Sequence, residues 1–253
     1  MEQRDLHPDA RVIRHKKRVE SEEESQGDGR LIEVVSEHFE RHVGPIASVL
    51  HEIKSDRVHL DVHIINPTDD HPYITLFTTG MAELPMHAPE GYESFRFAEL
   101  MIKLPADWPL EVGADNRDRP KHEIERWYWP VRLLKGLARL PHDYETWLFE
   151  SHSVPNGDPP EPYADNTELC GALVIVPMMD SEDFDVVEVD ADRRVHILQV
   201  LPIGPGEMDH KLRHGSDSLF ELFDQMQVSD VVDPTRFDVT GHRPRRKRFF
   251  GLF

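Results

Sequence analysis

A single cysteine, Cys170, occurs among the 253 residues, so the chain cannot form an internal disulfide bond. It lies in the apolar run Leu169–Val176, which favours a buried thiol over a reactive nucleophile. No apolar run approaches the roughly 20 residues of a membrane-spanning helix, so we expect no transmembrane segment. Met1–Glu24 has no apolar core of a secretory signal. We therefore expect a cytoplasmic protein.

Basic side chains are far fewer than acidic ones. The chain has 29 Lys and Arg residues against 48 Asp and Glu residues, a formal net charge of −19. Five of the cations lie in the last eleven positions, so residues 1–242 are more acidic still. Such a body repels the phosphates of nucleic acids and attracts basic polypeptides. The charge predicts that the folded body binds no nucleic acid and that its protein partner is basic.

Hydrophobic periodicity predicts a mixture of helices and strands. The spacing favours helices over 32–43, over 130–140 with Pro130 in the first turn, and from Ser218, which forms a capping-box pattern with Glu221. Strands are predicted at 58–65, 73–79, 95–104, 169–176, 186–189 and 195–201. We expect one α+β domain, a mixed α/β domain whose sheet is flanked by helices. It should span 31–227, between a flexible tail 1–30 and an irregular tail 228–253 with a basic-aromatic end.

His59, Asp61 and His63 form the most specific chemical pattern. Alternation in the strand 58–65 places them on one face, the polar and solvent-facing one. With His51 or Glu52 on a neighbouring strand they could form a His/carboxylate metal site. The other reading is a polar surface without a ligand, and replacing His59 or His63 by alanine should then leave the fold intact. We expect no metal and no cofactor, with a metal-dependent hydrolase using these three residues as the alternative function.

Two weaker patterns resemble enzyme motifs. Ser151, His152 and Asp165 could act as nucleophile, base and orienting carboxylate, but they lie in an irregular loop without a G-x-S-x-G elbow. The run Gly204-Pro205-Gly206 lacks the Lys-Ser/Thr of a phosphate loop and is interpreted as a turn. Neither pattern predicts an enzyme.

The C-terminal tail combines cations with apolar side chains. Its candidate contact residues are Arg245, Arg246, Lys247, Arg248, Phe249, Phe250, Leu252 and Phe253. The tail could have no role, could bind an anionic membrane surface, or could dock on a protein. We expect it to dock on its own domain or on the acidic face of a neighbour.

Several blocks of sequence, in this order, resemble the suppressor of fused family in its bacterial single-domain form. They are VHLDVHIINPT (58–68), ITLFTTGM (74–81), FAELMIKLP (97–105), WPVRLLKGLARLP (129–141), HSVPNG (152–157), LCGALVIVP (169–177), ILQVLP (197–202) and SLFELF (218–223). The resemblance implies a mixed α/β domain with no known enzymatic activity. Eukaryotic relatives hold an extended peptide between two lobes, partly by strand addition, and this chain resembles the N-terminal lobe alone. Bacterial relatives are proposed to be immunity proteins.

The resemblance also implies a ligand-binding loop. In the eukaryotic relatives, ligand contacts come from the loop that corresponds to 82–94 here. We expect a non-enzymatic protein- or peptide-binding domain, an immunity protein that neutralises a partner toxin. The expected partner is a protein or peptide, a basic domain of that toxin. The candidate protein-binding residues are His59, Asp61, His63, Glu90, Glu93, Trp108 and Trp127, the last from a run of three aromatic residues. The oligomeric state stays open.

Overall fold

The computed structural model describes residues 6–7, 11–15, 18, 27–52, 57–110, 121–181, 183–191 and 193–241. The tail Arg243–Phe253, with its predicted docking, lies outside the described residues, as does most of the predicted tail 1–30.

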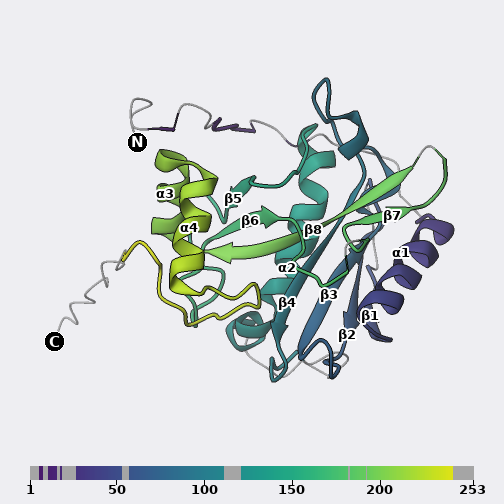
Figure 1. The fold of residues 1–253 in the computed structure, drawn as a ribbon, viewed down its shortest axis with the longest axis horizontal. Coiled ribbons are helices and arrows are strands. Elements are labelled where there is room, and N and C mark those ends of the chain that lie inside the picture. The colour runs from purple at the N-terminus through teal and green to yellow at the C-terminus, as the bar shows by residue number, and fades with distance from the viewer. Residues whose placement is uncertain are drawn as a thin grey trace.

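One mixed sheet forms the centre of the described structure (Figure 1). Its strands are β1 (Ile46–Leu50), β2 (Asp61–Ile65), β3 (Tyr73–Thr79), β4 (Ala98–Pro105), β5 (Ser153–Pro155), β6 (Gly171–Ile175), β7 (Val186–Glu188) and β8 (Arg194–Ile203). They are ordered β1-β2-β3-β4-β8-β6-β5, and β7 also pairs with β8. Within this sheet β4 and β8 pair in parallel, and the other paired strands are antiparallel.

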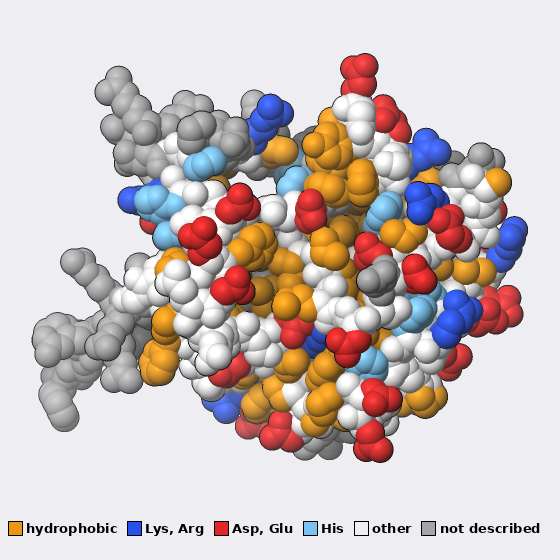
Figure 2. All heavy atoms as spheres, in the orientation of Figure 1, with side chains coloured by type: hydrophobic (Ala, Val, Ile, Leu, Met, Phe, Trp, Pro, Cys, Tyr) orange, Lys and Arg blue, Asp and Glu red, His pale blue; other side chains and the backbone are white. Residues whose placement is uncertain are grey.

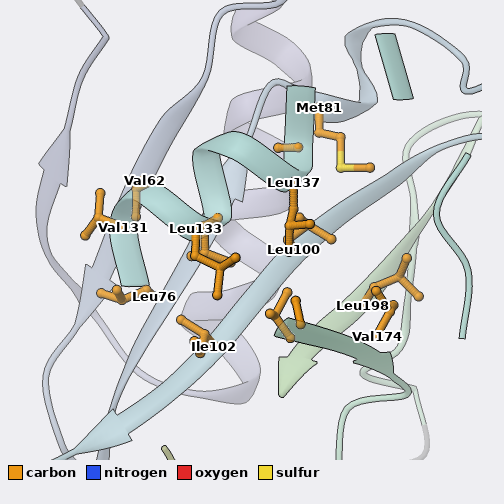
Figure 3. Packing of buried hydrophobic residues seen from close by; sticks show 14 of the residues in the cluster. Val62, Leu76, Met81, Leu100, Ile102, Val131, Leu133, Leu137, Val174 and Leu198 are labelled. Carbon is orange, nitrogen blue, oxygen red and sulfur yellow. The ribbon is translucent and has the colours of Figure 1, made fainter. Parts of the chain in front are cut away.

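Helices cover both faces of the sheet. The helices are α1 (Gly29–His42), η2 (Met81–Glu83), η3 (Glu93–Phe95), α2 (Lys121–Tyr144), α3 (Pro205–His214) and α4 (Ser216–Met226). Figure 3 shows Val131, Leu133 and Leu137 of α2 above Leu76 and Leu100 of the sheet. Alternate residues of the same strands point the other way, where α1, α3 and α4 pack. The predicted class, a mixed α/β domain with helices flanking a sheet, is confirmed.

The strand 58–65 differs from its prediction in length and in burial. It begins at Asp61, and every residue of β2 is buried on one face or the other. Ile65, on the same face as His63, packs in one cluster with Phe39 of α1. Helices cover both faces of the sheet. The side chains that the alternation predicted to face solvent are therefore inside the protein.

Three local predictions were wrong. Pro130 lies inside α2, which begins at Lys121. Ser218 and Glu221 form no capping box, since α4 begins at Ser216 after Gly215 and the Ser218 hydroxyl pairs with His210 Nε2 at 2.9 Å. The run Gly204-Pro205-Gly206 is the start of α3, with Pro205 in the first turn. Proline there lacks only an N–H that would have no partner within the helix.

Residues 228–241 form no helix or strand of their own, yet buried ionic contacts fasten them to the body. The Lys103 ammonium, itself buried, donates to Asp230 Oδ2 at 2.6 Å. Further along, Arg236 pairs with the fully buried Glu207 carboxylate. The Asp238 carboxylate accepts the N–H groups of Gly206 and Glu207 at 2.7 and 3.2 Å, at the start of α3. None of the described helices is long and apolar enough to cross a membrane.

Candidate functional site

Asp61 is the centre of the polar cluster that the sequence singled out. Asp61 is only 4% exposed. The carboxylate accepts a hydrogen bond from the Glu52 N–H at 3.1 Å and pairs with His51 Nδ1 at 2.9 Å. His51 contacts Oδ2 of this carboxylate, whereas His59 Nε2 lies 3.3 Å from Oδ1, the oxygen that accepts the Glu52 N–H. These contacts hold the end of β1 against the start of β2, which is a structural role.

His63 has contacts of its own inside the sheet. It is 4% exposed, its ring stacks on Phe77 with 4.6 Å between centroids, and Nε2 contacts Thr79 Oγ1 at 2.9 Å. Burial lowers the pKa of His63 to about 4, so the ring is neutral at pH 7. The prediction of a solvent-facing polar strand face is therefore wrong, and replacing His63 by alanine would leave a cavity in the core.

The described residues contain no group of three or more His, Cys, Asp and Glu side chains arranged to hold a metal ion. The serine–histidine–aspartate pattern is not assembled either. Asp165 accepts hydrogen bonds from Arg126 Nε and Nη2 at 2.6 and 2.9 Å. The His152 ring instead packs edge-on against Trp147, with 5.1 Å between centroids.

The two tryptophans proposed as contact residues pack against the core. Trp108 is 5% exposed, and its indole N–H donates to the Trp127 carbonyl at 2.9 Å. The two rings meet nearly at right angles, 5.3 Å apart. Trp127 is only half-buried, so part of it stays accessible. Trp108 is not a surface residue, because the first turns of α2 cover it. Its prediction as a contact residue is therefore wrong.

Glu90 and Glu93 lie exposed on the long connection from β3 to β4. The Glu93 carboxylate accepts the Gly91 N–H at 3.0 Å. Hydrogen bonds from its own backbone and from Gly91 hold the pKa of Glu93 below its usual value. Glu93 thus stabilises the turn that carries Tyr92, which lies between Gly91 and Glu93 in the sequence.

Six aromatic side chains from distant segments meet beside this loop, and we call them the aromatic patch. They are Tyr92, Phe95, Trp147, Phe149, His152 and His196. Tyr92 lies 5.0 Å from Trp147 and 5.6 Å from Phe149, between ring centroids. Tyr92 is 42% exposed, and the other five are half-buried. In Figure 2, acidic side chains lie at the tip of the loop that projects at the top, and hydrophobic side chains gather below it.

The two histidines of the aromatic patch carry no charge at neutral pH. Burial lowers the pKa of His152 and of His196. The His196 Nε2 lies 3.1 Å from the Ser94 carbonyl, an acceptor, so this nitrogen carries the proton and donates. The patch is therefore an uncharged aromatic surface. Sequence reasoning missed it, and the one available signal was the position of Tyr92 within the predicted ligand-binding loop.

Comparison with known proteins gives one family. The sequence profile of the suppressor of fused protein family matches residues 56–237, which include the whole aromatic patch. No curated protein matches the chain. A suppressor of fused homologue from Neisseria gonorrhoeae is similar in fold, with a TM-score of 0.57 and 14% identity, over 83% of this chain and 94% of that one. A chain of the Sufu–Fu complex has a TM-score of 0.57 and 15% identity, over 83% and 91%.

Proposed function

The chain belongs to the suppressor of fused family, and from this premise we propose that it binds another polypeptide and does not catalyse a reaction. The observation that carries the proposal is the aromatic patch, with Tyr92 exposed among half-buried rings. Exposed tyrosine and tryptophan dominate the energetics of protein interfaces because they bury a large area with little loss of side-chain freedom. A structural neighbour from the Sufu–Fu complex supports a binding role.

The contacts of the candidate catalytic residues favour this proposal over the hydrolase alternative. Asp61 is engaged by His51 and Glu52, and Asp165 by Arg126. Asp61 would be needed to bind a metal, and Asp165 to orient a histidine base. Both carboxylates instead take part in contacts that stabilise the fold. Glu90, in the loop of the patch, and the half-buried Trp127 remain proposed contact residues, whereas His59 and Asp61 contact each other at the start of β2.

The partner that we propose is a basic polypeptide met in the cytoplasm. The net charge of −19 supports this choice, because complementary charge accelerates the encounter between two proteins. The buried thiol of Cys170, whose pKa burial raises to about 11, suits a reducing compartment in which it stays unmodified. In the narrower form of the proposal the partner is a toxin that this chain neutralises.

Tyr92→Ser tests the binding function. We expect a partner recovered from the native host by the wild-type chain to be lost at least tenfold from the variant. Phe237→Ser is the matched control, since Phe237 is an aromatic residue 92% exposed and outside the patch. Equal thermal stability of both variants would exclude a folding defect. A partner retained equally by wild type and Tyr92→Ser would contradict a binding site at the patch.

Co-expression tests the toxin hypothesis. A polypeptide encoded beside this chain should arrest growth when it is expressed alone, and growth should recover with the wild-type chain but not with Tyr92→Ser. A neighbour that is harmless alone would remove the immunity role and leave the binding function standing.

A further inference from the structure

We infer that the aromatic patch holds an arginine side chain of the partner, an inference that rests on the protein-binding function proposed above. Four cation–π contacts occur within the described part of the chain, and they show how its aromatic rings are used. Arg96 and Arg193 lie over Phe97, at 5.2 and 5.3 Å from the centroid. The other two place Lys103 over Tyr73 and Arg236 over Phe223. None of these contacts uses a ring of the patch, so its ring faces hold no cation from the described chain.

The cations near the patch have partners outside it. Arg96 follows Phe95 in sequence, but its guanidinium lies over Phe97. The Lys211 ammonium, near His152, donates to Ser153 Oγ at 3.1 Å. Arg194, on the strand of His196, pairs with Glu188 at 2.7 Å. Both histidines are neutral, so none of the six side chains of the patch repels a cation at pH 7. Lys211 and Arg194 act on these histidines from outside the patch, and each is held by its own partner.

Carboxylates border the aromatic patch. Glu90 and Glu93 are exposed on the loop of Tyr92, and Glu150 is exposed directly after Phe149. Among the described residues, no Lys or Arg forms an ion pair with Glu90 or Glu150. Trp147 and Phe149 stack on each other, and Tyr92 is the exposed ring. Aromatic ring faces carry partial negative charge, so Tyr92 beside unpaired carboxylates forms a receptor for a cation.

Arginine fits this receptor better than lysine does. Its planar guanidinium can stack on a ring while its N–H groups reach a carboxylate at the edge. A lysine ammonium is more strongly hydrated and offers no flat face to stack. Proline-rich and purely apolar segments could also contact aromatic rings, but they would leave the bordering carboxylates without a partner.

The test is a selection of random twelve-residue peptides displayed on phage against the full-length protein. Arginine and lysine are encoded at equal frequency, so that general attraction to the acidic body favours neither. We expect arginine to be enriched over lysine about threefold, because arginine adds ring stacking and hydrogen bonds to the cation–π attraction that both side chains share. The enrichment should disappear with Tyr92→Ser, weaken with Glu90→Gln combined with Glu150→Gln, and persist with Phe237→Ser.

The other outcomes separate this inference from the function on which it rests. Peptides that depend on Tyr92 but contain arginine no more often than lysine would overturn the arginine site and leave the patch as a protein-binding surface. Peptides whose binding does not change with Tyr92→Ser would overturn both.

Discussion

Glu99 is a carboxyl group sealed inside the fold at the start of the loop that carries Tyr92. It is fully buried, accepts hydrogen bonds from the N–H groups of Gly80 and Ala82 at 2.8 and 3.0 Å, and contacts Thr78 Oγ1 at 2.7 Å. Burial raises the pKa of Glu99 to about 8. At neutral pH the protonated form predominates, because removing water penalises the charge more than the hydrogen bonds favour it.

This pKa predicts how stability depends on pH. Because the folded pKa is raised, the folded state holds a proton that the unfolded chain releases near its ordinary value of 4.5. The contribution of Glu99 to stability is therefore full at low pH and is lost as pH rises toward 8, by about 1.4 kcal/mol per pH unit within that window. Glu99→Gln, an uncharged isostere, should lack this slope.

Urea unfolding of wild type and Glu99→Gln at pH 5, 6, 7 and 8 measures the difference between the two slopes. Taking the difference cancels the titration of the histidines, which both proteins share. Parallel pH profiles would show that Glu99 does not hold its proton in the folded state.

Single residues show where sequence periodicity stops being informative. The strand end at Gly80 was predictable from glycine alone, and the structure gives a stronger reason. Gly80 has φ of +108°, and a Cβ there would lie 1.8 Å from the His59 carbonyl oxygen. The burial of His63 was not predictable, since alternation identifies a polar face but not the helix that covers it. The burial of Trp108 was not predictable either, because the sequence does not show that α2 packs over it.

At the scale of elements, the segment 228–241 is held to α3 by a buried ion pair. The Glu207 carboxylate accepts N–H groups from Gly204 at 2.7 Å and from Val239 at 3.0 Å, besides its pair with Arg236. It lies in the first turn of α3, where the helix dipole favours negative charge. The Arg236 guanidinium also donates to the Pro202 carbonyl at 3.0 Å, which ties the segment to β8.

Removing Arg236 should destabilise the protein strongly. Arg236→Leu leaves the buried Glu207 carboxylate without its countercharge, at a cost of about 3 kcal/mol in the free energy of unfolding. Arg126→Leu is the matched control. Its partner Asp165 lies 2.6 Å away, but both side chains are nearly half exposed, so the cost should stay below about 1 kcal/mol. Denaturant unfolding measures both.

A second substitution distinguishes loss of the ion pair from loss of packing. Glu207→Gln added to Arg236→Leu removes the uncompensated charge and should restore part of the lost stability. Equal losses for Arg236→Leu and Arg126→Leu would mean that the segment 228–241 contributes little to the fold.

Elements were predicted well where the pattern was long and regular. The strand 73–79 matches β3 residue for residue, and the first helix differs from α1 only at its ends. Short elements were missed: β5 has three residues and contains Pro155, which gives no periodicity to detect. The predicted start of α2 at Pro130 was wrong, because proline usually marks the first turn of a helix. Here the helix continues through Pro130, and the packing of Trp129 and Val131 in the core stabilises it.

At the scale of the molecule, the fold class followed from the mixture of periods, but the candidate site did not. The parallel pairing of β4 with β8 joins segments almost a hundred residues apart and brings His196 opposite Ala98. That pairing puts Phe95 against His196, with 4.7 Å between ring centroids, while the chain after α2 supplies Trp147 and Phe149. No spacing rule connects such positions, so the aromatic patch became visible only in three dimensions.

The excess of acidic side chains predicts how stability responds to salt. At a net charge of −19 the folded chain repels itself, and the unfolded chain spreads the same charges further apart. Raising sodium chloride from about 0.01 to about 0.15 M shortens the screening length from about 30 to about 8 Å. The melting temperature at pH 7 should therefore rise by a few degrees.

Two opposing effects are too small to reverse this rise. Exposed ion pairs such as Arg194–Glu188 contribute little, so screening them costs little. Buried pairs such as Lys103–Asp230 are screened much less. The control is the same salt step at pH 5.2, near the isoelectric point, where the net charge vanishes and the melting temperature should stay constant. Differential scanning calorimetry measures both steps. A fall at pH 7, or equal rises at both pH values, would mean that net repulsion does not limit the stability of this fold.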